Sequence, residues 1–196
     1  MRREELTELH YIAHMDNVQS IIRHGILSNR RAAKLPHTSV AMQQVQDRRA
    51  EVVVPGGRKL HEYVNLYICA RNPMLSKRRG QHLDLCVLQV STDVLDRPGV
   101  VVTDANASSD YVRFAAAPGG LRIVDREATF AEYWTDQDPI VQWQKKSAKC
   151  AEVLVPDRVA PGFIMGAYIS CQAAMDRFNG LGTGIAVIIN AHMFFR

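Results

Sequence analysis

Short runs of hydrophobic residues, separated by polar turns, recur through most of the chain. Several have the length and the β-branched or aromatic content that are typical of strands. The predicted strands cover residues 10–15, 63–70, 83–90, 99–103, 150–155 and 185–190. A further segment, residues 163–179, is expected to begin as a strand and to end as a helix around residues 171–178.

A helix is predicted where hydrophobic residues recur at helical spacing between a cap and a stop. Asp16 has the chemistry of an N-cap and Gly25 is a typical C-terminal stop, so residues 16–24 are predicted to be helical. Residues 39–49 are a second and less amphipathic helix candidate. The polar and basic residues 28–38 are expected to form a loop.

Residues 104–149 show little periodicity, and this affects the choice of fold class. A segment of this length in a compact chain is more typical of a functional loop region with small helices than of a plain connection. Helices and strands also fail to alternate regularly, which disfavours a doubly wound parallel sheet. We therefore predict a single domain over residues 1–196 of the α+β class, with two packed mixed β-sheets and peripheral helices.

Composition excludes several classes of protein. Hydrophobic residues make up 47% and charged residues 22% of the 196, a globular balance rather than a disordered or fibrous one. The longest apolar runs fall far short of the ~20 residues that span a bilayer, and the charged start lacks the apolar core of a signal peptide. We expect a cytoplasmic protein with no metal centre and with four buried free thiols, because the cysteines lie in apolar stretches without a CxxC pair. They are Cys69, Cys86, Cys150 and Cys171.

The net charge of +4 is unevenly distributed along the sequence. Residues 1–80 hold 14 Lys and Arg against 7 Asp and Glu, whereas residues 81–196 hold 10 against 13. A basic N-terminal half suits a polyanionic partner, either a nucleic acid or a dinucleotide, although a solvated basic surface gives the same count. The basic residues come in short bursts, which are typical of loop contacts to phosphates.

Glu152 is a carboxylate in the middle of the apolar run 150–155. Strand alternation places it with Leu154 on the face opposite Ala151 and Val153. A carboxylate in such surroundings is disfavoured unless it is paired or used in chemistry. Two interpretations stay open: Glu152 faces solvent or pairs with a basic residue, or the strand positions it to polarise a hydroxyl or stabilise a cation.

Two other groups of residues have weaker chemical signals. Arg48 and Arg49 form either a solvated helix end or a fork that grips a phosphate. His10 and His14 share one face of a predicted strand, but no third ligand has a spacing that would complete a metal site. The sequence contains no P-loop, GxGxxG, GxSxG or HExxH motif.

Four segments, in this order along the chain, together resemble the DarT-type DNA ADP-ribosyltransferase toxins. The resemblance extends from about residue 9 to about residue 178, and the third segment is the most specific. The segments are His10-Tyr-Ile-Ala-His-Met-Asp-Asn17 with the following Gly25-Ile-Leu27, Arg48-Arg49 with Val52–Pro55, His61-Glu-Tyr-Val-Asn-Leu-Tyr67 with Arg71-Asn-Pro-Met-Leu75, and Lys149-Cys-Ala-Glu152-Val-Leu-Val155.

This resemblance implies an ADP-ribosyltransferase-like fold in which NAD binds in the cleft between two packed mixed sheets. Members of the family transfer ADP-ribose from NAD to a base in single-stranded DNA and release nicotinamide. Thymine is the better-known target, and a related branch uses guanine. The resemblance also implies a partner, a macrodomain antitoxin that removes the modification.

The resemblance assigns roles to particular residues. It makes Glu152 the catalytic glutamate and one of Arg48 and Arg49 the essential arginine, with Arg49 favoured by the apolar residues that follow. His14 and Asn17 match the NAD-binding N-terminus of the family, where the nicotinamide end is held. Asn106 falls where a DNA-contacting side chain is expected and some relatives have a histidine, which leaves the modified base open.

The chemistry of such a reaction suits these residue types. Cleavage of the bond between C1′ and nicotinamide gives the ribose oxocarbenium character, which a nearby carboxylate stabilises. An arginine can polarise the base carbonyl, or Glu152 can assist removal of the base proton. Duplex DNA hides the base edges, so a single-stranded or extruded nucleotide is the expected substrate. The aromatic segment from Tyr111 to Trp134 is expected to form a substrate loop over the cleft.

Two other hypotheses remain at this stage. The chain is alternatively a non-catalytic module that binds single-stranded nucleic acid on the same scaffold. The second alternative is an ADP-ribosyltransferase whose acceptor is a protein or an RNA. Glu152 separates the first of these from an enzyme, because a pure binder gains nothing from a carboxylate that faces a polyanion.

Overall fold

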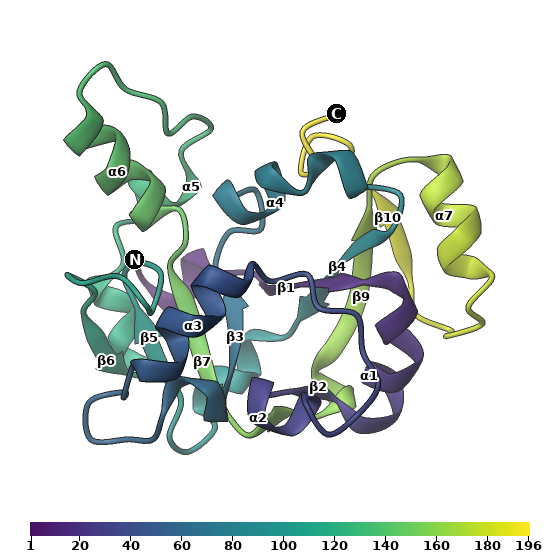
Figure 1. The fold of residues 1–196 in the computed structure, drawn as a ribbon, viewed down its shortest axis with the longest axis horizontal. Helices are drawn as coiled ribbons and strands as arrows, with labels where there is room; N and C mark the ends of the chain where they lie inside the picture. Colours follow the sequence, from purple (N-terminus) through teal and green to yellow (C-terminus); the bar gives the residue numbers. More distant parts are fainter.

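A computed structural model describes all residues, 1–196, and places an eight-stranded mixed sheet at the centre of the molecule (Figure 1). The strand order is β10-β9-β4-β1-β3-β7-β5-β6, and only the β9–β10 pair is parallel. A separate pair, β2 and β8, is antiparallel. The strands are β1 (Leu9–His14), β2 (Ile26–Leu27), β3 (Tyr63–Tyr67), β4 (Leu85–Val90), β5 (Val101–Thr103), β6 (Phe114–Ala116), β7 (Glu152–Pro156), β8 (Arg158–Val159), β9 (Ile164–Ile169) and β10 (Val187–Ile189).

The large sheet has two halves of four strands that meet at a narrow junction. Strands β1 and β3 are joined by a single residue pair, His10 with Tyr67, whereas β1 and β4 pair along their whole length. The α+β class and the expected mixed sheets are therefore confirmed, with one correction: hydrogen bonding at this junction links the two expected sheets into one. Beyond this one pair, the facing edges of β1 and β3 are not paired with each other, which leaves room for a cavity between the halves.

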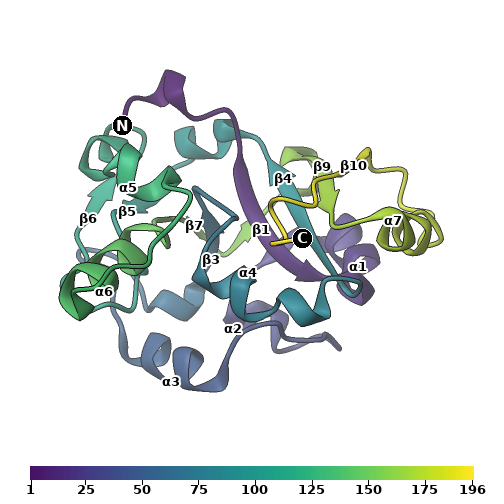
Figure 2. The same ribbon diagram turned by 90° about the horizontal axis from the view of Figure 1, so that it is seen from above.

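Helices surround the sheet, as Figure 2 shows from above, with α6 and α7 at opposite ends of the molecule. The α-helices are α1 (Val18–His24), α2 (Asn29–Ala32), α3 (Gln43–Glu51), α4 (Pro73–Lys77), α5 (Arg126–Phe130), α6 (Pro139–Ala148) and α7 (Gln172–Asn179). The 3₁₀ turns are η1 (Arg3–Glu5), η2 (Met15–Asn17), η3 (Leu60–Glu62), η4 (Arg79–Gln81), η5 (Thr92–Asp96), η6 (Gly119–Ile123) and η7 (Pro161–Phe163).

The predicted helix over residues 16–24 is present, but its beginning differs from the prediction. It starts as η2, and the Nδ1 atom of His14, not the side chain of Asp16, accepts the capping hydrogen bond. Gly25 ends α1 with a φ of 82°, a conformation that favours glycine. The segment 28–38 was expected to be a loop but contains α2, whose four residues are too few to show a helical period.

The hydrophobic core confirms the alternation predicted around Glu152. Its main cluster of 27 buried residues includes Ala151, Val153 and Val155, and Leu154 lies in a different cluster together with Val54 and Leu60. The strand therefore buries one face in the main core and turns Glu152 to the other. All four cysteines are free thiols; Cys171 is partly exposed rather than buried as expected, because it lies at the N-terminus of α7.

Candidate active site

The fold holds Glu152 at the first position of β7, in the middle of one sheet half. Its neighbours in register are Tyr67 on β3 and Thr103 on β5, and the side chain has no exposure to solvent. The backbone N–H of Glu152 donates to Thr103 Oγ1 at 3.2 Å, and that hydroxyl donates to the carbonyl of Ala105 at 2.7 Å. These bonds fix the glutamate and the start of the loop that follows β5.

Arg49 is the partner of this buried carboxylate. It is the one buried residue of α3, and its Nη1 and Nη2 atoms donate to Oε1 and Oε2 of Glu152, both at 3.1 Å. Two parallel bonds of this kind are the strong, bidentate form of an arginine–carboxylate contact. Burial lowers the pKa of the Arg49 guanidinium, but the Glu152 carboxylate more than offsets this and holds the pKa above its ordinary value.

Arg48 is exposed on the other side of α3. Of the two arginines that the sequence left open, the structure therefore brings Arg49, and not Arg48, to Glu152. The role of either arginine in a reaction remains a prediction at this point. Of the two structural alternatives for Glu152, pairing with a basic residue is the one observed.

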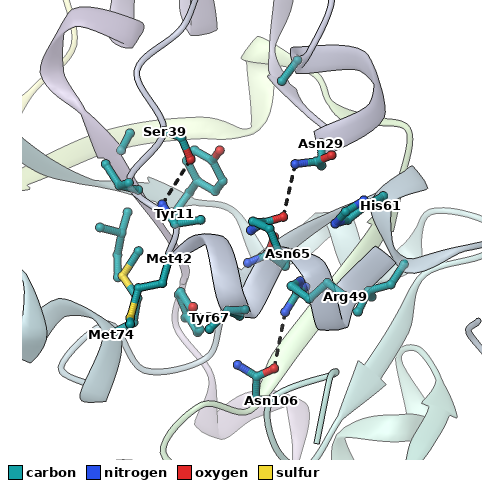
Figure 3. A pocket seen from close by; sticks show the side chains of 18 of the residues that line it. Tyr11, Asn29, Ser39, Met42, Arg49, His61, Asn65, Tyr67, Met74 and Asn106 are labelled. Carbon is teal, nitrogen blue, oxygen red and sulfur yellow. Dashed lines mark hydrogen bonds between the residues drawn. The ribbon is translucent and has the colours of Figure 1, made fainter. Parts of the chain in front are cut away.

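Asn106 is the third polar side chain in contact with the pair. Its Oδ1 atom accepts from Arg49 Nη1 at 3.5 Å, from the backbone N–H of Ser108 at 3.0 Å and from Ser108 Oγ at 2.8 Å. Because three donors surround this oxygen, the Nδ2 amide group is turned away from them. Arg49 and Asn106 lie together at the wall of the cavity in Figure 3.

A cavity opens at the junction between the two sheet halves (Figure 3). Arg49 lines this cavity, whereas Glu152 is fully buried and does not. The walls of the cavity come from β1, β3, α2, α3, α4 and the segment 37–42, and its lining combines apolar, aromatic and polar side chains. Labelled lining residues in Figure 3 are Tyr11, Asn29, Ser39, Met42, Arg49, His61, Asn65, Tyr67, Met74 and Asn106.

Three polar residues that line this cavity, His61, Asn65 and Tyr67, had no role predicted from the sequence. His61 Nε2 is buried without a hydrogen-bond partner, and burial followed by the charge of Arg49 lowers the pKa of this histidine. Burial and the charge of Glu152 raise the pKa of Tyr67 well above its ordinary value, so its phenol stays protonated. The alternation of residues 63, 65 and 67 with the buried Val64 and Leu66 could have indicated that Asn65 and Tyr67 face away from the main core.

Asn17 lines the cavity and holds its cover in place. Its Nδ2 atom donates to the carbonyl of Thr38 at 2.7 Å, and the backbone N–H of Thr38 donates to Asn17 Oδ1 at 2.9 Å. Both ends of the amide are thus used to fix the segment 37–42. His14 does not line the cavity, and its ring lies 3.3 Å from the Asp16 carboxylate.

His10 lies outside the cavity as well. Its Nε2 atom is 3.1 Å from Oε1 of Glu8, and its Nδ1 atom is buried without a partner. No group of three or more His, Cys, Asp or Glu side chains in the structure is arranged to hold a metal ion. None of the helices is both long and apolar enough to span a membrane.

The segment predicted as a substrate loop divides into two parts. At one end, Tyr111 packs edge to face on Trp143 of α6 with ring centroids 6.2 Å apart. Just before this segment, Ser109 Oγ lies 3.4 Å from Ser147 Oγ of the same helix. At the other end, Trp134 packs against Phe195 near the C-terminus of the chain. The first part follows Asn106 directly and is therefore the part that adjoins the Arg49–Glu152 pair.

The fold, with a buried arginine–glutamate pair beside the cavity between the sheet halves, is that of the ADP-ribosyltransferase-like class. A family model described as "ssDNA thymidine ADP-ribosyltransferase, DarT" matches residues 10–195. The chain therefore belongs to the DarT family, as the sequence segments had indicated.

Known proteins similar to this chain include a "DNA ADP-ribosyl transferase-DNA ADP-ribosyl glycohydrolase fusion protein" of Thermosipho africanus, 33% identical over 83% of the chain. The chain spans 42% of that fusion protein. A solved structure, Thermus sp. 2.9 DarT in complex with ADP-ribosylated ssDNA, has a TM-score of 0.84 and 26% identity, covering 99% of both chains. The same protein in complex with NAD+ has a TM-score of 0.77 and 25% identity, covering 97% of this chain and 98% of the other.

Proposed function

We propose that this chain is an NAD-dependent DNA ADP-ribosyltransferase, a toxin that transfers ADP-ribose from NAD to thymine in single-stranded DNA and releases nicotinamide. The observation that carries the proposal is the Arg49–Glu152 pair, buried beside a cavity that opens between the two halves of the sheet. The complexes of the Thermus sp. protein with NAD+ and with ADP-ribosylated ssDNA support both substrates.

Several residues that line the cavity suit the chemical groups of NAD. Apolar residues such as Val45 and Leu60 offer surfaces for the rings of the dinucleotide, and Asn65 offers a hydrogen-bonding amide. Lys77 supplies positive charge for the pyrophosphate, and Arg49 adds positive charge where the lining of the cavity adjoins Glu152. Asn17 contributes by fixing the segment 37–42 over the cavity, and His14 contributes by capping the turn from which Asn17 projects.

Glu152 and Arg49 have different roles in the proposed transfer of ADP-ribose. A base nitrogen attacks C1′ of the ribose while the bond from C1′ to nicotinamide breaks, and the nitrogen gives up its proton. Glu152 stabilises the positive charge that develops on the ribose and accepts that proton, because each carboxylate oxygen keeps an acceptor position beyond its bond to Arg49. Arg49 donates to a carbonyl of the base and stabilises the negative charge left there.

The orientation of Asn106 favours thymine over guanine as the acceptor. With its Oδ1 atom occupied by three donors, the side chain offers its amide N–H groups to the substrate, next to the donors of Arg49. Thymine flanks its N3 nitrogen with two carbonyl acceptors, whereas the amino group of guanine is itself a donor. Two donors at the site therefore complement thymine, and guanine stays the alternative acceptor.

The biological setting follows from the relatives and the composition. The Thermosipho africanus relative joins a DNA ADP-ribosyl transferase to a DNA ADP-ribosyl glycohydrolase. We infer a partner of the same activity for this chain, a macrodomain antitoxin that reverses the modification. Free thiols throughout fit a cytoplasmic location, and residues 1–196 are taken as one domain that needs no metal.

Release of nicotinamide from NAD+ tests the proposed activity. The protein is incubated with NAD+ alone and with single-stranded oligonucleotides of thymine or guanine, an RNA of matching length, or a protein extract. Single-stranded thymine DNA is expected to stimulate release most. Stimulation by RNA or protein alone would contradict the proposed acceptor, and NAD+ that binds without release under any condition would favour a non-catalytic module.

A further inference from the structure

A second hollow lies behind the wall that α2 contributes to the cavity. Asn29 and Ala32 of α2 face the first cavity, whereas Arg30 and Arg31 face the second. No hydrophobic residue lines this second hollow. A hollow of this character does not offer a surface for a base or an apolar side chain, so its ligand is expected to be polar or charged.

Positive charge exceeds negative charge in this hollow. Four basic residues line it, Arg30, Arg31, Lys34 and Arg58, against the two carboxylates of Glu62 and Asp157. These six residues are the only charged groups that line it.

The carboxylates engage three of the four cations. Arg30 pairs with Glu62, Arg58 Nη1 lies 2.7 Å from Asp157 Oδ2, and Arg31 Nε lies 3.4 Å from Asp157 Oδ1. Lys34 forms no ion pair, and the three arginine side chains are about half exposed or more. The surplus charge is therefore accessible to an anion.

Ser28 gives an independent indication of a ligand. The residue lines the hollow and is 1% exposed, and its Oγ atom is buried without a hydrogen-bond partner. Its backbone N–H donates to the carbonyl of Asp157 at 2.9 Å, which fixes the position of the serine against the ion-pair network. Buried polar groups are almost always satisfied by the protein, by ordered water or by a ligand, so this hydroxyl is free to donate to an acceptor from outside the protein.

We propose that this hollow binds a backbone phosphate of single-stranded DNA, with Ser28 Oγ and the Lys34 ammonium as donors to the phosphate oxygens. The inference rests on the proposed function, since it places the strand that carries the modified base. Serine hydroxyls and lysines are typical phosphate contacts in protein–DNA complexes. The other anion available to the protein, the pyrophosphate of NAD, belongs to a ligand that we place in the first cavity, on the opposite side of α2.

The test measures affinity for a single-stranded oligonucleotide over a range of salt concentrations. Lys34→Gln removes the unpaired cation without breaking an ion pair, and Arg97→Gln is the matched control, because Arg97 is likewise an exposed cation outside every ion pair of the structure. Loss of one phosphate contact to single-stranded DNA lowers the slope of log affinity against log salt by about 0.7. The corresponding loss of affinity is about four-fold at ~0.15 M salt and about eight-fold at ~0.05 M salt.

Ser28→Ala is the second variant, and it separates a binding role from a structural one. Removal of an unpaired buried hydroxyl is expected to leave the melting temperature unchanged or higher, while affinity for the oligonucleotide falls. Inorganic phosphate, used as a probe, is expected to compete with DNA in the wild type more strongly than in Lys34→Gln. A lower melting temperature of Ser28→Ala with unchanged DNA affinity would show a structural hydroxyl and overturn the proposal.

The outcomes also distinguish this proposal from the proposed function. If Lys34→Gln weakens NAD+ binding but not DNA binding, the hollow serves the dinucleotide, and the proposal is wrong. If both Lys34→Gln and Arg97→Gln match the wild type, the hollow is an ion-pair network only, and the proposal is again wrong. Failure of the wild type to modify any DNA would instead refute the proposed function, whatever the salt dependence of the variants.

Discussion

Truncation of either member of the Arg49–Glu152 pair is expected to destabilise the fold as well as the reaction. Glu152 has no solvent exposure and Arg49 is 5% exposed, so Glu152→Ala leaves a buried guanidinium and Arg49→Ala leaves a buried carboxylate. An uncompensated buried charge of this kind costs about 3–5 kcal/mol. For a chain of this size, each kcal/mol shifts the melting temperature by ~2–4 °C, so each single variant is expected to melt roughly 6–20 °C lower.

The double variant provides the decisive comparison. Arg49→Ala with Glu152→Ala removes both charges together, so its loss of stability is expected to be no larger than that of either single variant. The resulting interaction energy, about 3 kcal/mol, is typical of groups in direct contact. Urea unfolding followed by tryptophan fluorescence measures all three free energies, and Arg48→Ala on the exposed side of α3 serves as the control, with a change within ~0.5 kcal/mol.

Additive losses in the double variant would refute this reasoning. They would mean that the two side chains stabilise the protein independently, and that the bidentate contact at 3.1 Å does not hold the pair together in solution. Losses below ~1 kcal/mol in both single variants would likewise contradict the uncompensated-charge argument.

Three further predictions concern the cavity and its surroundings. Asn17→Ala frees the segment 37–42, so steady-state kinetics are expected to show a several-fold higher KM for NAD+ with a smaller change in kcat. Burial and a neighbouring cation lower the pKa of His61 in the folded protein below its ordinary value of 6.5. The free energy of unfolding therefore falls as the pH drops below 6.5, because the histidine is protonated more readily in the unfolded chain. His61→Gln should therefore flatten the fall in melting temperature between about pH 8 and about pH 5. Tyr111→Ala and Trp143→Ala remove an exposed aromatic pair, and titrations should show affinity for single-stranded DNA falling by about 5- to 100-fold with unchanged NAD+ affinity.

Much of the fold and the central carboxylate could be predicted from the sequence. The strands β1, β3, β4, β7 and β9 lie in mainly apolar segments, and their boundaries differ from the predicted ones by only a few residues. Glu152 was detectable because a carboxylate inside such a run needs a physical reason. Alternation placed its neighbours correctly because the period of a strand is fixed by its geometry.

The arginine partner required the tertiary structure. Arg48 and Arg49 are adjacent on α3, and this helix has no clear apolar face. The sequence therefore does not indicate which of the two arginines points into the protein. The two sheet halves are joined by a single residue pair between β1 and β3, and the hydrophobic periodicity of the sequence does not predict such a contact. The segment 37–42 is likewise held by side chains that are distant in the sequence, Asn17 at Thr38 and Arg78 at the carbonyl of Ala41.

The central claim is tested most directly by the mass of a single-stranded oligonucleotide after incubation with the protein and NAD+. The oligonucleotide contains one thymine and one guanine among adenines and cytosines, and fragmentation shows which base has changed. The account predicts a gain of one ADP-ribose on the thymine with the wild type. It predicts no gain with Glu152→Gln, although that variant still binds DNA. An unchanged mass with the wild type, or an equal gain with Glu152→Gln, would contradict it.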